Sequence, residues 1–176
     1  IYNYYYAIHI MEILLNHNAD INTTDKQDKT PLDYIIDAMK RAASDNTAKT
    51  GVFMLSKGGV WTQKTDGVLK IISSIEERLL EEACISNNVD VARKLLKNYK
   101  FENREMERPF GYASVLGHIE IVKLLIKYGA NIDKARFSFS RFDYRYSTPL
   151  CAAIITGQVD IAEYLIRNGA NLELTR

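Results

Sequence analysis

Apolar residues recur along the chain in a pattern that predicts a series of amphipathic helices. Residues 118–131 and 158–171 align without gaps, and residues 10–20 and 89–99 contain less complete copies of the same stretch. Each copy has apolar residues at positions i, i+1, i+4 and i+5, which place one buried stripe on a helix. The pattern therefore predicts an all-α fold that is built from repeated units.

A glycine follows the last apolar residue in the two clearest copies, at Gly129 and Gly169. Glycine takes a positive φ without steric cost, so we expect it to end the helix in the left-handed conformation. Asn18 occupies the same position in the first copy and can take that conformation at some cost. Tyr99 stands there in the copy at 89–99 and fits the role poorly.

A shorter helix is predicted before each of these helices. The three prolines lie at its expected start, in the pairs Thr30-Pro31, Arg108-Pro109 and Thr148-Pro149. Threonine caps a helix N-terminus, and proline suits the first turn. In the two clearest copies the residue before proline stands 21 residues before the closing glycine. The unit is therefore a short helix, a tight turn, a longer helix and a loop.

These signals resemble the ankyrin repeat, whose pattern includes T-P-L-H-x-A-A and G-H-x-E-I-V. The clearest matches here are Gly117-His118-Ile119-Glu120-Ile121-Val122 and Thr148-Pro149-Leu150. The resemblance implies a solenoid of stacked antiparallel helix pairs with hairpin-like loops between repeats. Neither end shows a clear polar capping repeat, so we expect a piece of a longer array. The approximate units are 1–22 (partial), 23–60, an irregular insertion at 61–77, 78–103, 104–133 and 134–176.

Two regions depart from this spacing. The second copy runs 28 residues from Thr30 to Gly58, seven more than the others, and we expect the surplus in a polar loop near residues 44–49. Residues 61–66 are expected to form a loop. The apolar stripe that follows, from Val68 to Ala83, predicts either one long helix or an extra helix that leads into the third repeat.

The largest insertion between repeats is at residues 134–147. It holds five aromatic and four basic residues against one acidic residue. Phe137, Phe139 and Arg141 stand at every second position, an alternation that favours an extended hairpin. Insertions in a solenoid often lie on the binding face. Two alternatives are open: the loop binds a partner, or its phenylalanines fold back onto a neighbouring repeat.

The resemblance implies a partner-binding concave surface made of first helices and inter-repeat loops. Apolar residues occupy four first-helix positions that the family usually leaves polar or variable, Ile85, Val115, Leu116 and Ile155. They either pack under neighbouring side chains or line an apolar groove for a partner. Arginines in the loop would favour an acidic or phosphorylated partner surface. The candidate partner-binding residues are Tyr112, Val115, Leu116, Ile155, Arg136, Phe137, Phe139, Arg141, Phe142, Tyr144, Arg145 and Tyr146.

Composition limits the other classes of function. The net charge is +1, from 23 Lys+Arg and 22 Asp+Glu, which does not indicate a nucleic-acid binder, although the 134–147 loop keeps that as a lesser alternative. The chain has no apolar run of 18 residues, so we expect no membrane insertion. Cys84 and Cys151 are too few for a disulfide framework or a zinc site. We expect two buried thiols in a reducing compartment, a cytoplasmic location, and no cofactor or metal.

The sequence contains no catalytic motif that we can identify. His118 stands at the family's turn position, where a histidine packs and forms hydrogen bonds, and His9 and His17 are expected on the surface. The carboxylates at 76–77, 81–82 and 105–107 are interpreted as solvated faces or loops. We therefore expect a monomeric, non-catalytic scaffold for a protein partner. The alternative is the targeting half of a larger effector enzyme from an intracellular bacterium or a large virus, which would act in the host cytosol.

Overall fold

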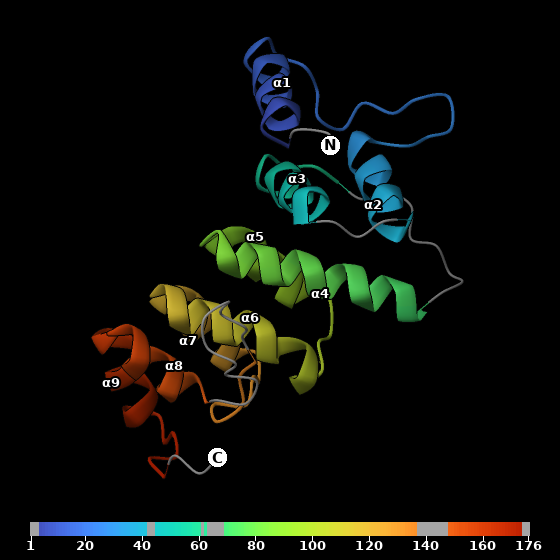
Figure 1. The fold of residues 1–176 in the computed structure, drawn as a ribbon. Helices are drawn as coiled ribbons and strands as arrows, with labels where there is room; N and C mark the ends of the chain where they lie inside the picture. Colours follow the sequence, from blue (N-terminus) through green and yellow to red (C-terminus); the bar gives the residue numbers. More distant parts are fainter. Residues whose placement is uncertain (1–3, 42–44, 61, 63–68, 137–147, 174–176) are drawn as a thin grey trace. The chain divides into compact units, whose positions relative to one another are not determined.

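The computed structural model describes residues 4–41, 45–60, 62, 69–136 and 148–173 (Figure 1). Within these residues the regular secondary structure consists of nine α-helices, and Ala135 forms an isolated β-bridge. The all-α prediction is confirmed. The chain divides into two compact units, residues 1–82 and residues 83–176.

The first unit contains α1 (Tyr4–Asn16), α2 (Pro31–Arg41), α3 (Asp45–Ser56) and most of α4 (Leu69–Ile85). Helices α2 and α3 pack against each other, and α3 also contacts α1. In α2 the buried apolar residues are Leu32, Ile36 and Met39, whose spacing places them on one side of the helix. Burial of this stripe against α3 holds the helix pair together.

A buried carboxylate fixes the start of α2. Asp33 is 2% exposed and accepts a hydrogen bond of 2.8 Å from the backbone N–H of Thr30. The Thr30 hydroxyl oxygen in turn accepts a bond of 3.3 Å from the backbone N–H of Asp33, so the predicted threonine cap is confirmed. The backbone N–H and the hydroxyl of Thr62 also donate to the Asp33 carboxylate, at 3.1 and 2.6 Å. Asp33 therefore ties the segment after α3 back to the start of α2.

The second unit forms two layers of helices. It contains α5 (Val89–Asn98), α6 (Asn103–Leu116), α7 (Ile119–Lys127), α8 (Pro149–Thr156) and α9 (Val159–Arg167). Helix α6 pairs with α7 and α8 pairs with α9, while α6 also packs against α8, and α7 packs against both α5 and α9. The first helices of successive repeats thus form one layer, and the second helices form the other (Figure 1).

The helix ends follow the predicted turn chemistry. Gly129 and Gly169 have φ values of 94° and 86°, so both close their helices in the left-handed region, as predicted. Asn18 also lies there, with a φ of 63°. Gly117 and Gly157 take φ values of 81° and 73° in the tight turns that join the two helices of each pair. Tyr99, by contrast, is extended, with a φ of −125°.

The polar loop expected near residues 44–49 is wrong, because α3 begins at Asp45. The seven surplus residues of this repeat mainly lengthen its helices. Helix α2 has 11 residues and α3 has 12, whereas α8 and α9 have 8 and 9. The polar start of α3 is helical because Ala48 and Val52, four residues apart, are both buried.

The start of α6 also differs from the prediction. Pro109 lies inside this helix, which begins at Asn103. A capping box starts it: the side chains of Glu102 and Glu105 each accept a hydrogen bond from the backbone of the other residue, which satisfies two N–H groups of the first turn. The apolar stripe ahead of the third repeat forms one long helix, α4, with 17 residues. Asp66, its candidate cap, lies outside the described residues.

Candidate partner-binding site

The candidate surface centres on the neighbouring helices α6 and α8. Val115 on α6 is only 4% exposed and forms a buried apolar cluster with Ala152 on α8, which is fully buried. The small alanine side chain lets the two helices approach closely enough to cover Val115. Val115 therefore belongs to the core, and its inclusion in an exposed apolar groove is wrong.

Leu116 and Ile155 lie on the exposed part of the same two helices. The Leu116 side chain is 40% exposed and the Ile155 side chain is 55% exposed. Tyr112 is half-buried on α6, and Ile85 is half-buried at the end of α4. Of the four apolar first-helix positions, Leu116 and Ile155 thus remain open to solvent.

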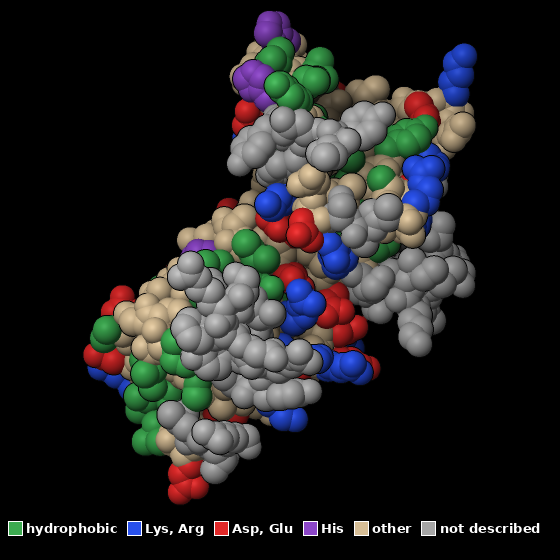
Figure 2. Space-filling view, viewed as in Figure 1, with side chains coloured by type: hydrophobic (Ala, Val, Ile, Leu, Met, Phe, Trp, Pro, Cys, Tyr) green, Lys and Arg blue, Asp and Glu red, His purple; other side chains and the backbone are tan. Residues whose placement is uncertain are grey.

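Sequence reasoning missed a third exposed residue of this surface, Ile154, which is 55% exposed. The aligned position in the preceding repeat holds Ser114, which is fully buried where α8 packs on α6. The alignment itself was the available signal, because it places an isoleucine at a position where the preceding first helix has a small serine that packs against its neighbour. Figure 2 shows that hydrophobic side chains gather over α8 and α9. Val159 and Ile166 on α9 are exposed as well, and so is Leu172 in the segment after α9.

Arg136 marks the start of the 134–147 insertion and is anchored to α6. Its backbone N–H donates a hydrogen bond of 2.8 Å to the carbonyl oxygen of Glu107, and its Nε lies 3.8 Å from a carboxylate oxygen of the same residue. The neighbouring Ala135 is buried. This anchor fixes where the insertion leaves the helical unit. The other candidates in the loop lie outside the described residues: Phe137, Phe139, Arg141, Phe142, Tyr144, Arg145 and Tyr146.

The histidines occupy the environments that the sequence predicts. His118 begins α7, and its Nδ1 lies 2.8 Å from the carbonyl oxygen of Cys84. His9 and His17 are exposed on α1 or directly after it. Cys84 is buried as expected, whereas Cys151 is half-buried. Among the described residues no cluster of three or more His, Cys, Asp or Glu side chains could hold a metal ion.

Two carboxylates are less exposed than the sequence suggests. Glu76 and Glu82 on α4 are 9% and 8% exposed, so the interpretation of these residues as a solvated face is wrong. Burial raises the pKa of Glu82 to about 7; the nearby negative charge of Asp45 adds to this rise, and the positive charge of Lys49 opposes it. Desolvation disfavours the charged form of a carboxyl group, so we expect Glu82 to make the stability of this unit depend on pH.

Comparison with known proteins identifies the family. The family model for ankyrin repeats in three copies matches residues 41–136 and 80–176, which together span more than three-quarters of the chain. The chain therefore belongs to the ankyrin repeat family, and its fold is an all-α ankyrin solenoid. Ankyrin repeats are generally protein–protein interaction modules, and the fold is typically non-catalytic.

Among solved structures, the chain is similar to the human ASB11 ankyrin repeat domain, with 18% sequence identity and a TM-score of 0.46. The match covers 93% of this chain and 65% of that chain, so the present chain spans less than two-thirds of its length. A search of curated proteins found no match. No helix in the described part of the chain has the length and apolar character needed to cross a membrane.

Proposed function

We propose that this chain is a non-catalytic scaffold that binds a partner protein through the exposed face of α6 and α8 and through the 134–147 loop. The observation that carries the proposal is the pair Leu116 and Ile155, which are 40% and 55% exposed on adjacent first helices. Apolar side chains that gather on a surface are typical of interaction sites. Contact with a partner would remove this apolar area from water and so favour association.

The fold itself does not require an apolar residue at the position of Leu116. The position that aligns with Leu116 in the next repeat is Thr156, which is exposed on α8. A polar residue is therefore compatible with the end of a first helix. Leu116 is better explained by contact with a partner than by the needs of the helix pair.

The start of the insertion adds a cationic group to the proposed surface. Arg136 is half-exposed, and a guanidinium group forms paired hydrogen bonds with carboxylate or phosphate oxygens. We extend the proposal to Arg141 and Arg145 and to the aromatic residues of the loop. An acidic or phosphorylated surface on the partner would complement this group of charges.

Site-specific crosslinking tests the proposal. A photoreactive amino acid replaces Leu116 in one variant and Ile155 in another, and each protein is irradiated in a native lysate. Both sites should crosslink the same protein. A matched probe at Glu120, which is exposed on α7 in the other helix layer, should not crosslink it. Equal crosslinking from all three sites, or none from Leu116 and Ile155, would contradict the proposal.

Substitution separates binding from folding. The double variant Leu116→Ser/Ile155→Ser should lose capture of the crosslinked protein and keep its melting temperature. Serine at Phe139, Arg141, Phe142 and Arg145 should likewise weaken capture with nearly unchanged melting. A large loss of stability with intact capture in the loop variant would instead favour a loop that folds back on the array.

A further inference from the structure

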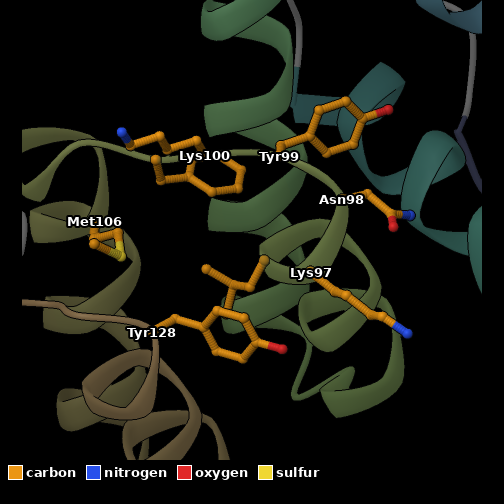
Figure 3. A pocket seen from close by; sticks show the side chains of 8 residues that line it. Lys97, Asn98, Tyr99, Lys100, Met106 and Tyr128 are labelled. Carbon is orange, nitrogen blue, oxygen red and sulfur yellow. The ribbon is translucent and has the colours of Figure 1, made fainter.

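A cavity of about 400 Å³ opens in the second unit where α5 ends (Figure 3). Its walls come from three segments that are distant in sequence: the end of α5 with the loop that follows, the first turn of α6, and the end of α7. This volume is within the range of about 300–1,000 Å³ for ligand pockets. The lining residues are Leu96, Lys97, Asn98, Tyr99, Lys100, Phe101, Met106 and Tyr128.

The cavity arises from the way in which α5 ends. Helices α7 and α9 are each followed within two residues by a glycine of positive φ, Gly129 and Gly169. After α5 the equivalent residue is Tyr99, which is extended, with φ −125° and ψ 147°. The chain therefore continues away from the helix end instead of closing over it, and α6 starts early, at Asn103. Space is left between this extended loop and Tyr128.

The base of the cavity is apolar and its walls are aromatic. Leu96 and Met106 are 5% and 3% exposed, so their lining atoms belong to the core. Tyr99 and Phe101 are half-buried, and Tyr128 is 37% exposed. A cavity with this lining favours an apolar group, because that group loses contact with water when it enters.

The rim of the cavity is positively charged. Lys97 and Lys100 are both exposed, and Figure 3 shows their ammonium groups pointing away from each other. None of the eight lining residues is acidic. Residues 93–106 contain five basic residues and two acidic residues, Glu102 and Glu105, whose side chains each accept a hydrogen bond in the capping box of α6. The charge of this segment therefore favours an anionic ligand.

We propose that this cavity binds an acidic peptide segment of a partner protein, with one apolar side chain inserted between Tyr128 and Phe101 and flanking carboxylates beside Lys97 and Lys100. The apolar base selects against a ligand that carries only charge, and the two lysines select for carboxylates on both sides of the inserted side chain. The site goes beyond the proposed function, because it shares no residue with the surface of Leu116 and Ile155.

Fluorescence anisotropy with a defined peptide tests the site. The probe is a labelled nine-residue peptide with one central phenylalanine and three Glu or Asp residues on each side. The wild-type chain should bind it, and binding should weaken as salt concentration rises. A peptide with serine in place of phenylalanine, and a peptide with lysine in place of the acidic residues, should each bind at least about tenfold more weakly.

Two charge-reversal pairs separate the cavity from general basic charge. Lys97→Glu/Lys100→Glu should weaken binding by at least about tenfold. Arg93→Glu/Lys94→Glu introduces the same change in net charge at two exposed positions of α5 that do not line the cavity, and it should retain most of the binding. Leu116→Ser/Ile155→Ser should bind the peptide like the wild type, so failure of this site and failure of the proposed function are distinguishable.

Three results would overturn the assignment. The first is no measurable binding of the phenylalanine peptide by the wild type. The second is equal weakening by the two charge-reversal pairs, which would indicate attraction to the basic segment as a whole. The third is an equally tight complex with a single-stranded thymidine oligonucleotide, which would assign the site to nucleic acid. Circular dichroism melts of each variant confirm that the chain remains folded.

Discussion

The Nδ1 atom of His118 lies 2.8 Å from the carbonyl oxygen of Cys84. A carbonyl oxygen only accepts hydrogen bonds, so the Nδ1–H form of the imidazole makes this contact. Cys84 is on α4 and His118 begins α7, so the bond joins one repeat to the next. Gln158, at the aligned position one repeat later, makes the equivalent link when its Nε2 donates to the carbonyl oxygen of Val115 at 3.2 Å.

Replacement of His118 tests this link between repeats. His118→Ala should lower the free energy of unfolding by about 1 kcal/mol, because the hydrogen bond between the imidazole and the carbonyl oxygen of Cys84 is lost. His118→Gln should recover most of this loss, since Gln158 shows that a glutamine side chain can reach the preceding repeat. Urea unfolding measures both variants. Equal destabilisation by alanine and glutamine would show that the imidazole ring acts by packing alone.

The sequence pattern is sufficient to predict the second helices of the repeats and where most of them end. The apolar stripes predicted α5, α7 and α9, and the glycines at 129 and 169 marked where α7 and α9 close. The start of α6 was misplaced because Pro109 is a strong N-terminal signal, while the capping box of Glu102 and Glu105 begins the helix six residues earlier. Two start signals competed, and local sequence did not decide between them.

The candidate sites depended on contacts between repeats that no local pattern contains. Val115 is buried because the residue facing it in the next repeat is Ala152; a larger side chain there would hold the helices apart. The cavity needs the extended Tyr99 together with Tyr128, which is 29 residues further along the chain. The sequence identifies Tyr99 as a poor helix terminator, but the space that an extended Tyr99 leaves is a property of the folded unit.

Gly117 and Gly157 form a matched pair for a second prediction. Both have a positive φ, 81° and 73°, so alanine should be strained at either position, by about 1–2 kcal/mol. A Cβ atom at Gly157 would meet nothing within 4 Å, whereas one at Gly117 would lie 2.5 Å from Oε1 of Gln158. Gly117→Ala should therefore be the more destabilising, because it also displaces the glutamine that bonds to Val115.

Thermal melts of the two alanine variants should show this order. The control is the same pair of substitutions in a Gln158→Ala background, where the steric contact is absent and the two losses should become equal. If Gly157→Ala were as harmful as Gly117→Ala in the wild-type background, the contact with Gln158 would have no energetic effect.

Gly51 provides a test of how closely α3 and α4 pack. A Cβ atom at this position would lie 2.8 Å from Cδ2 of Leu79, and Leu79 is only 1% exposed. Gly51→Ala should destabilise the first unit, although alanine favours a helix over glycine by about 1 kcal/mol. Leu79→Ala alone should lose about 2–5 kcal/mol because it leaves a cavity.

The double variant Gly51→Ala/Leu79→Ala should be more stable than the sum of the two single losses predicts. The added methyl group then occupies part of the space that the leucine vacated, and the residues are in direct contact, where such coupling is expected. Chemical denaturation of all four proteins completes the cycle. Strictly additive losses would contradict the close contact between Gly51 and Leu79.

The last prediction concerns Glu82, whose pKa burial raises from 4.5 to about 7. The folded chain then binds this proton more tightly than the unfolded chain does. The free energy of unfolding should therefore fall as pH rises from about 4.5 to about 7, and the contribution of the protonated carboxyl should be lost above that range. Glu82→Gln mimics the neutral form, so it should flatten this part of the profile and be more stable than the wild type at pH 8.

Urea unfolding across this pH range measures both proteins. The control is Glu120→Gln, a change at an exposed position of α7, which should keep the wild-type slope. Each unit of difference between the folded and the unfolded pKa of Glu82 corresponds to about 1.4 kcal/mol of stability. Parallel profiles for the wild type and Glu82→Gln would therefore show that the pKa of Glu82 is the same in the folded and the unfolded chain.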